Sequence, residues 1–192
     1  MITHLRPALV IMAFFTLLTG LAYPLLFAGA AHFVLPGRAG GSVITKDGVV
    51  VGSRLIGQRF TSDQYFHGRP SAAGADGYDA SASSGSNLGP LSKKLVDRVA
   101  ADVATLQAAG ASAIPADAVT ASASGLDPHI SVAFAGLQVD RVAKARGLPA
   151  ETVRAILARH IETPFLGIFG EERVNVLELN LALDAQHNPP VG

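Results

Sequence analysis

The chain has 192 residues, with fifteen Lys and Arg, fifteen Asp and Glu, and no cysteine. The absence of cysteine excludes disulfides, thiolate catalysis and Cys-ligated metal sites. All fifteen acidic residues but only fourteen basic ones follow Gly37. This nearly neutral balance argues against a nucleic-acid partner, because phosphate backbones are bound by strongly basic surfaces.

The N-terminal part of the chain is apolar. No Asp, Glu, Lys or Arg occurs from residue 8 to residue 35, and a membrane-spanning helix needs only about 20 apolar residues. We therefore expect a short tail over residues 1–7, a transmembrane anchor helix over 8–35 and a flexible linker over 36–41. Pro24 is expected to kink the helix.

A cleaved signal peptide is the alternative interpretation of this segment. Arg6 supplies a basic start, and Ala28-Gly29-Ala30 resembles a cleavage site. The apolar part of a signal peptide spans about 7–15 residues, which is much shorter than this run, so the pattern favours an uncleaved anchor. The flanking charges leave the orientation open, since Arg6 precedes the segment while Arg38 and Lys46 follow it.

Residues 42–192 are expected to form one soluble domain. Residues 43–45 and 49–51 flank Lys46-Asp47-Gly48 and predict a β-hairpin, with 55–60 continuing the sheet. Aliphatic residues then almost vanish from residue 62 to residue 90, a length that is uncommon for a loop without a function. Its aromatic residues indicate an ordered loop, because they can be buried as anchors; they are Tyr65, Phe66 and Tyr78.

The rest of the domain mixes helices with short strands. Apolar spacing, Pro and Gly predict three helices and two strands. The helices are expected from Pro90 to Gly110, from 131 to 146 with Gly147 as the stop, and from 148 to about 161; the strands at 119–120 and 174–181. Because strands and helices do not alternate regularly, the sequence predicts an α+β fold.

Two runs of small polar residues, 83–90 and 122–129, contain little that could build a hydrophobic core. Gly, Ser, Asn and Pro in such runs specify loop shapes, and ordered loops on a rigid scaffold are where binding surfaces tend to lie. The first run could hold an anion at the start of the following helix, or simply lead rigidly into that helix. No Gly-Lys-Ser/Thr phosphate-binding motif occurs in it.

A membrane-anchored serine hydrolase is the alternative function. Ser124, Asp127 and His129 have the residue types of a catalytic triad, but triad members usually come from distant segments. The Gly-x-Ser-x-Gly motif is absent around Ser124, and Asp127-Pro128 is better explained as a turn that precedes a helix. No catalytic residue is therefore assigned.

A third stretch, residues 65–71, mixes aromatic, cationic and turn residues as protein interfaces do. The histidines are scattered without metal-ligand spacing, so no metal site is expected. Together the three stretches supply the candidates for contact with a partner or ligand: Tyr65, Phe66, Arg69, Ser86, Asn87, Ser124 and Asp127.

In combination, these segments resemble the C subunit of the bacterial Kdp potassium-transporting P-type ATPase. The resemblance runs in order over nearly the whole chain, although each motif alone is weak. Where the family often has Ser-Gly-Gly-Ser-Asn, this chain has Ser84 at the first glycine, and Glu172 takes a position often held by Pro. The matching stretches are 5–9, 52–60, 65–72, 84–88, 119–127, Gln138, 141–146 and 180–184.

The resemblance implies a non-catalytic accessory subunit in the bacterial inner membrane. Its implied partners are a channel-like potassium-translocating subunit and a catalytic P-type ATPase subunit, and its soluble domain lies on the outer, periplasmic face. It also implies a role as a catalytic chaperone that raises ATP affinity, although no firmly bound cofactor is expected. ATP is cytosolic, so an outer domain could act on it only through coupling across the membrane. Support of assembly therefore ranks above nucleotide binding.

Overall fold

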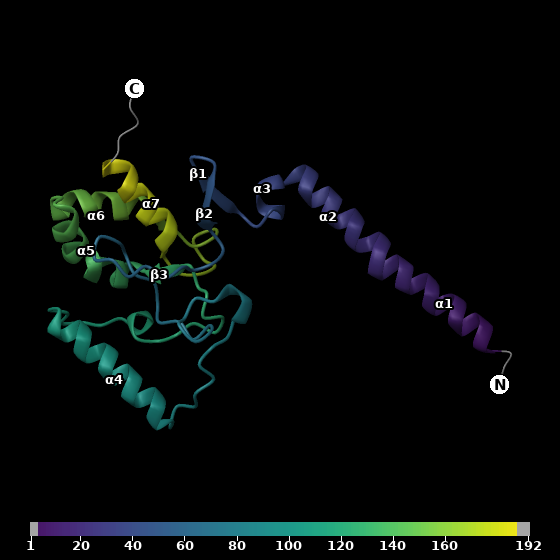
Figure 1. Ribbon diagram of the computed structural model, residues 1–192, viewed down its shortest axis with the longest axis horizontal. Coiled ribbons are helices and arrows are strands. Elements are labelled where there is room, and N and C mark those ends of the chain that lie inside the picture. The colour runs from purple at the N-terminus through teal and green to yellow at the C-terminus, as the bar shows by residue number, and fades with distance from the viewer. Residues whose placement is uncertain (1–3, 188–192) are drawn as a thin grey trace. The chain divides into compact units, whose positions relative to one another are not determined.

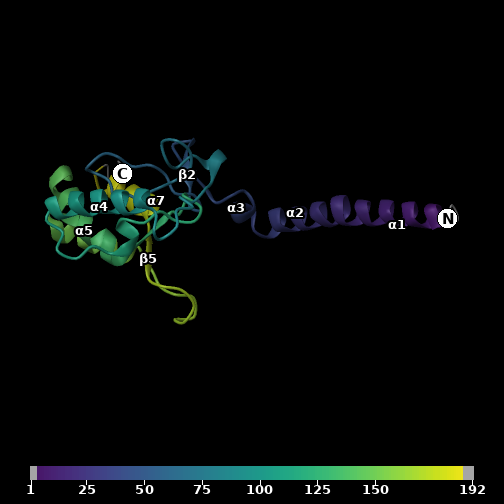
Figure 2. The same cartoon turned by 90° about the horizontal axis from the view of Figure 1, so that it is seen from below.

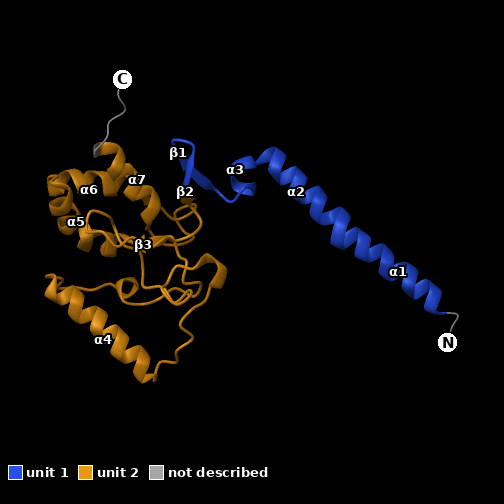
Figure 3. Ribbon diagram, viewed as in Figure 1, with its two compact units in different colours: residues 1–51 blue, residues 52–192 orange. Residues whose placement is uncertain are grey.

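The computed structural model describes residues 4–187, so residues 1–3 of the predicted tail and 188–192 of the predicted soluble domain lie outside the described range. The chain divides into two compact units, residues 1–51 and 52–192 (Figure 3). Helices and short strands are both present, which confirms the α+β class (Figure 1). A soluble domain that begins at residue 42 stays a prediction.

The first unit is dominated by one apolar helix. It runs through α1 (Leu5–Leu17), a π-helical turn η2 (Leu18–Ala22) and α2 (Tyr23–Val34), and its 30 residues are long and apolar enough to cross a membrane. Pro24 cannot donate a backbone hydrogen bond to the preceding turn, and the π turn lies directly before it. None of this helix is buried within its own chain.

A helical turn and a hairpin follow in the same unit. Residues Pro36–Ala39 form the short helix α3, so part of the predicted flexible linker is helical. Strands β1 (Val43–Lys46) and β2 (Val49–Ser53) pair as predicted. Asp47 and Gly48 have φ angles of 53° and 78°, as a two-residue turn with two left-handed positions requires. Residues 55–60 do not continue this sheet, and the prediction of a strand there is wrong.

Residues 52–187 of the second unit contain four α-helices. Helix α4 (Lys93–Ala108) begins after Ser92, three residues later than predicted from Pro90, and Leu91 is exposed. Gly110 has φ of 95° and ends it as expected. Helix α5 (Val132–Arg146) is capped by the Ser131 hydroxyl, which accepts the Phe134 N–H, and Gly147 ends it with φ of 66°. Helix α6 is Ala150–Arg159.

A three-stranded antiparallel sheet lies beside these helices. Its order is β3 (His129–Ser131), β5 (Arg173–Asn175) and β4 (Ile161–Glu162), with Ile130 and Ile161 both opposite Val174. The sequence did not predict β3 or β4. The predicted strand at 119–120 is wrong, because the short helix η4 (Ala116–Ala118) ends at that point.

The strand predicted over 174–181 is also wrong beyond Asn175, since helix α7 (Val176–His187) follows. The Asn175 side chain accepts the backbone N–H of Glu178 and so caps the first turn. Val176, Leu179 and Leu183 are buried, at the spacing of one helical face. This apolar segment therefore forms a helix, because it has an N-terminal cap and its buried residues follow the 3.6-residue period.

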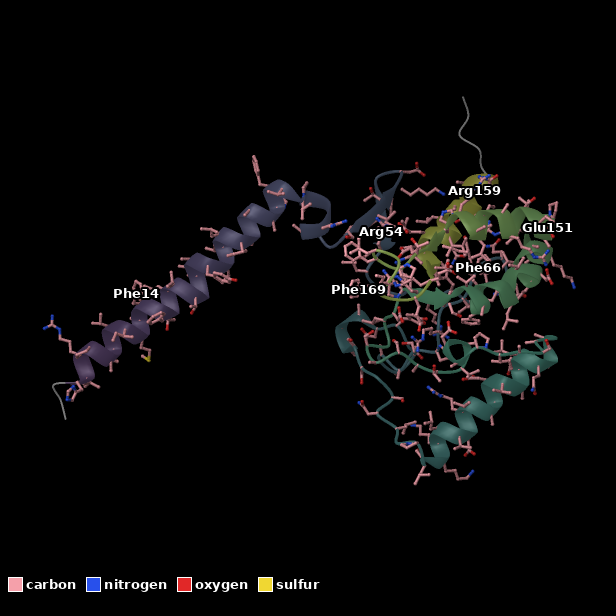
Figure 4. All side chains as sticks on the ribbon, turned by 180° about the vertical axis from the view of Figure 1, so that it is seen from behind. Phe14, Arg54, Phe66, Glu151, Arg159 and Phe169 are labelled. Carbon is pink, nitrogen blue, oxygen red and sulfur yellow. The ribbon has the colours of Figure 1, made fainter. Side chains whose placement is uncertain are left out.

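The core of the second unit is formed by α5, α6 and α7 with the sheet. Phe66, from the long loop, is fully buried among these residues (Figure 4). Val99, Val103 and Leu106 of α4 are only partly buried against the core. The core thus presents a helical surface against which the loop 62–90 packs through Phe66.

Candidate functional site: a loop layer held by helix side chains

Two side-chain amides fix the backbone of the long loop. Asn180 of α7 accepts the Phe66 N–H at 2.8 Å and donates to the Phe66 carbonyl at 2.9 Å. Gln138 of α5 does the same for the next residue, His67, at 2.8 and 3.0 Å. Each amide satisfies one backbone donor and one acceptor, as a neighbouring β-strand would do.

Two arginines of α5 extend this arrangement toward the start of the loop. Arg141 donates to the carbonyl oxygens of Asp63 and Tyr65, at 2.7 and 3.1 Å, and Arg146 donates to that of Gln64 at 2.6 Å. We call the four side chains together the backbone clamp: Gln138, Arg141, Arg146 and Asn180. Its side chains take the place of a neighbouring strand, so residues 63–67 are ordered without regular secondary structure.

Tyr65 lies at the edge of the backbone clamp. Its hydroxyl donates to Asp184 at 3.2 Å, and its ring lies under the Arg146 guanidinium at 5.0 Å. Arg146 also pairs with Asp184 at 2.8 Å. Burial and the neighbouring Asp184 carboxylate raise the pKa of the Tyr65 phenol, despite the opposing effect of Arg146. The phenol is therefore a hydrogen-bond donor at neutral pH.

Arg69 connects the long loop to the second polar run. Its Nη1 donates to Asp127 Oδ2 at 3.0 Å, and its Nε and Nη2 reach the carbonyl and hydroxyl of Thr120 at 3.4 Å. Burial raises the pKa of the Asp127 carboxyl, but hydrogen bonds from His129 and Arg69 outweigh it, so the net shift is downward. Asp127 is thus charged and held between two donors.

The turn after Arg69 is fixed by Ser71 and Tyr78. The Ser71 hydroxyl donates to the Gly125 carbonyl at 2.6 Å and accepts the Tyr78 N–H at 2.8 Å. The Tyr78 hydroxyl donates to the Arg69 carbonyl at 2.6 Å, and burial raises the pKa of Tyr78 to about 12. This part of the loop is therefore hydrogen-bonded both within itself and to residues 120–129.

The two polar runs predicted as binding loops lie against each other. The Ser124 carbonyl accepts the Ser84 N–H and the Ser83 hydroxyl, each at 3.0 Å. A side chain at Gly85 would put its Cβ 2.9 Å from the Ala123 carbonyl, so glycine permits this close approach. We call residues 65–78, 83–87 and 120–129 together the loop layer.

The contact candidates differ in what they expose. The Phe66 ring is fully buried, so it anchors the loop and cannot touch a partner. Tyr65, Arg69, Ser86 and Asp127 are half-buried, whereas Ser124 and Asn87 are exposed, Asn87 with φ of 50°. The fold brings all seven into the loop layer, and the contacts themselves stay a prediction.

The geometry does not assemble a Ser124–His129 hydrolase. The two His129 ring nitrogens lie 3.7 Å from Asp127 Oδ1 and from Glu162 Oε2, and the Ser124 Oγ accepts the Leu126 N–H at 3.1 Å. His129 instead lies in a row of polar and charged side chains that runs from Arg69 through Asp127 and Glu162 to Arg173. This row borders a groove of about 590 Å³.

In the sequence, the helix residues that hold the loop layer stood out only through the family resemblance, which covers Gln138, 141–146 and 180–184, and no contact was predicted for them. Gln138 and Asn180 are buried polar side chains on otherwise apolar helix faces, a further signal that could have pointed to this role. Within residues 4–187 there is no cluster of three or more His, Asp or Glu residues that could hold a metal ion.

Comparison with known proteins identifies the family. A family model described as "K+-transporting ATPase, c chain" matches residues 5–185. A protein of Gemmatimonas aurantiaca named potassium-transporting ATPase KdpC subunit is 59% identical over 187 residues, covering 96% of this chain and 94% of the relative. One of the same name from Caulobacter vibrioides is 58% identical over 191 residues, covering 98% and 96%.

The family match agrees with the two parts of the structure. One N-terminal helix long enough to span a bilayer fits a single-pass membrane protein, and the loop layer falls within the matched residues. With this identity over nearly the full length of both chains, the chain belongs to the KdpC family, the C subunits of the K+-transporting ATPase.

Proposed function

We propose that this chain is a non-catalytic accessory subunit that holds the K+-transporting ATPase together. Its partners in this proposal are the channel-like potassium-translocating subunit and the catalytic P-type ATPase subunit. The apolar helix supports this, because none of its surface is buried within its own chain and it is free to pack on other membrane helices. The chain then contributes contacts, and the larger subunits carry out ATP hydrolysis and transport.

The backbone clamp is the observation on which the proposal mainly rests. Asn180, Gln138 and Arg141 each bind loop backbone, and Arg69 and Asp127 bind each other. Polar groups that an enzyme would direct at a substrate are here used to fix a loop surface. A loop ordered before binding loses less conformational entropy when it docks, which favours a stable interface.

The direct test is to purify the tagged complex with and without this chain. We expect the complex that lacks it to lose one of the larger subunits during purification and to lose K+-stimulated ATP hydrolysis. Adding the purified chain back should restore both, since the proposed role is stoichiometric contact. A complex that stays assembled and fully active without the chain would contradict the proposal.

We further propose that the second unit lies on the outer face of the inner membrane. The chain has no cysteine, so a single introduced thiol reports one position. Lys94→Cys, on the exposed surface of α4, should react with a membrane-impermeant maleimide in intact cells. The control Arg6→Cys, in the first turn of the apolar helix, should react only after the cells are permeabilised. The reverse pattern would place the second unit in the cytosol.

The same labelling experiment also tests whether the second unit can contact ATP. Contact between ATP and the Ser86–Asn87 part of the loop layer requires a cytosolic second unit. With the second unit outside, a catalytic chaperone effect on ATP affinity has to arise from different contacts with two conformations of the pump. We therefore place assembly first and an indirect effect on ATP affinity second.

A further inference from the structure

The loop between β4 and β5 exposes the largest apolar side chains of the second unit. We call residues 163–170 the apolar finger; it extends away from β5 in Figure 2, and Figure 4 labels Phe169 on it. It contains no charged residue. Four of its side chains are mostly exposed: Phe165 73%, Leu166 72%, Ile168 78% and Phe169 65%. Large exposed patches of this kind mark interaction sites.

The apolar finger has its own defined backbone structure. Phe165 and Phe169 exchange two backbone hydrogen bonds, each of 3.0 Å, and Gly167 donates to the Pro164 carbonyl at 3.0 Å. Leu166 has φ of 54°, an unfavourable region for a residue with a branched side chain. The tip is a closed turn in which the N–H groups of Phe165, Gly167, Ile168 and Phe169 are hydrogen-bonded within the apolar finger, which lowers the cost of removing it from water.

The charges around the apolar finger distinguish between a lipid bilayer and a protein as its partner. Glu162 precedes it and Glu171 and Glu172 follow it, while Arg173 is engaged with Glu162 at 3.0 Å. Loops that bind anionic membranes combine apolar tips with Lys and Arg, and this one is flanked by carboxylates. An apolar centre with a polar, charged rim is the composition of a protein interface.

We propose that the apolar finger inserts into an apolar pocket on another subunit of the complex, at a rim rich in Lys or Arg that faces Glu171 and Glu172. This inference rests on the proposed accessory function and names one of its contacts. In the proposed function, the membrane helix already tethers the chain to its partners. A second contact within the same assembly benefits from a high effective concentration, so a small pocket is sufficient.

Site-specific photocrosslinking tests the partner directly. A photoreactive phenylalanine analogue replaces Ile168 in the full chain within the assembled complex. We expect adducts with a protein subunit of the complex. The matched control carries the analogue at Leu91, which is 96% exposed but lies outside the apolar finger, and should give few adducts. Adducts with lipid alone, or none at position 168, would overturn the proposal.

A double variant, Phe165→Ser with Phe169→Ser, tests the contribution to assembly. Buried aromatic side chains are frequent anchors of protein interfaces, so removing both should weaken association at least about 10-fold. The variant chain should unfold like the unmodified one, because both rings are exposed. If the complex fails without the chain but assembles normally with this variant, the finger has no such role and the accessory function stands.

Discussion

Asn180→Leu is expected to destabilise the second unit by about 2–5 kcal/mol, because it leaves two backbone groups of Phe66 without partners in the core. Asn180 is 1% exposed, and both its amide atoms are used, one as acceptor and one as donor. Leucine has a similar size, so the change mainly removes hydrogen bonds. The loss should appear as a lower urea midpoint for the full chain in detergent.

Tyrosine fluorescence provides a local readout for this experiment. The chain has no tryptophan and three tyrosines, of which Tyr65 and Tyr78 lie in the loop layer. The control Gln186→Leu places the same side chain on an exposed position of the same helix and should change stability by less than about 0.5 kcal/mol. Equal midpoints for the two variants would show that the backbone clamp contributes little.

The Asn180→Leu variant should also assemble less well into the complex. Asn180 holds Phe66, and the neighbouring residues Tyr65 and His67 are held by Arg141 and Gln138. Once Phe66 is released, the position of the whole loop 62–90 depends on fewer contacts. A proposed contact residue such as Arg69 is then less ordered before docking, and ordering it on docking costs binding free energy.

Local signals predicted local structure well. The Asp47-Gly48 turn and the Gly147 stop were each predicted from a few residues, and both are present in the fold. The Ser131 cap is equally local, but it was not predicted. The wrong strand prediction over 174–181 also came from reading local signals alone. The alternating pattern there fits a strand, and the cap by Asn175 depends on a strand end set by pairing with His129, 46 positions away along the chain.

The residues of the candidate site could be predicted from the sequence, but the contacts that hold them in place could not. Residues 65–71 and 122–129 stand out in sequence because their residue types suit ordered loops. The supports of residues 65–71 come from helices 71 to 114 residues away along the chain, as the pairs His67–Gln138 and Phe66–Asn180 show. No local pattern contains such a pairing. The apolar finger was missed for a different reason, because apolar residues are assumed to be buried until a structure exposes them.

Gly125→Ala should disrupt the loop layer much more than a glycine substitution normally does. Gly125 has φ of 66°, and an added Cβ would lie 2.6 Å from the Ser84 carbonyl oxygen and 2.7 Å from the Ala73 nitrogen. Both are backbone atoms, which cannot rotate away as a side chain can. The chain must therefore separate the two polar runs or unfold this corner.

Gly147 provides a matched control for this prediction. It has the same φ of 66°, but an added Cβ would meet no atom within 4 Å. Gly147→Ala should cost about 1 kcal/mol, the conformational cost of a left-handed alanine. Gly125→Ala should exceed it by about 2 kcal/mol or more, measured by urea unfolding of the full chain.

The variants Gly125→Ala and Gly147→Ala also test whether the loop layer contributes to assembly of the complex. If the two polar runs act as one surface, Gly125→Ala should reduce recovery of the assembled ATPase, and Gly147→Ala should not, because Gly147 lies at the end of α5 and outside the loop layer. Equal unfolding midpoints would refute the close packing around Gly125. Normal assembly by a destabilised Gly125→Ala chain would instead separate the loop layer from the interface and leave the membrane helix and the apolar finger as the contacts.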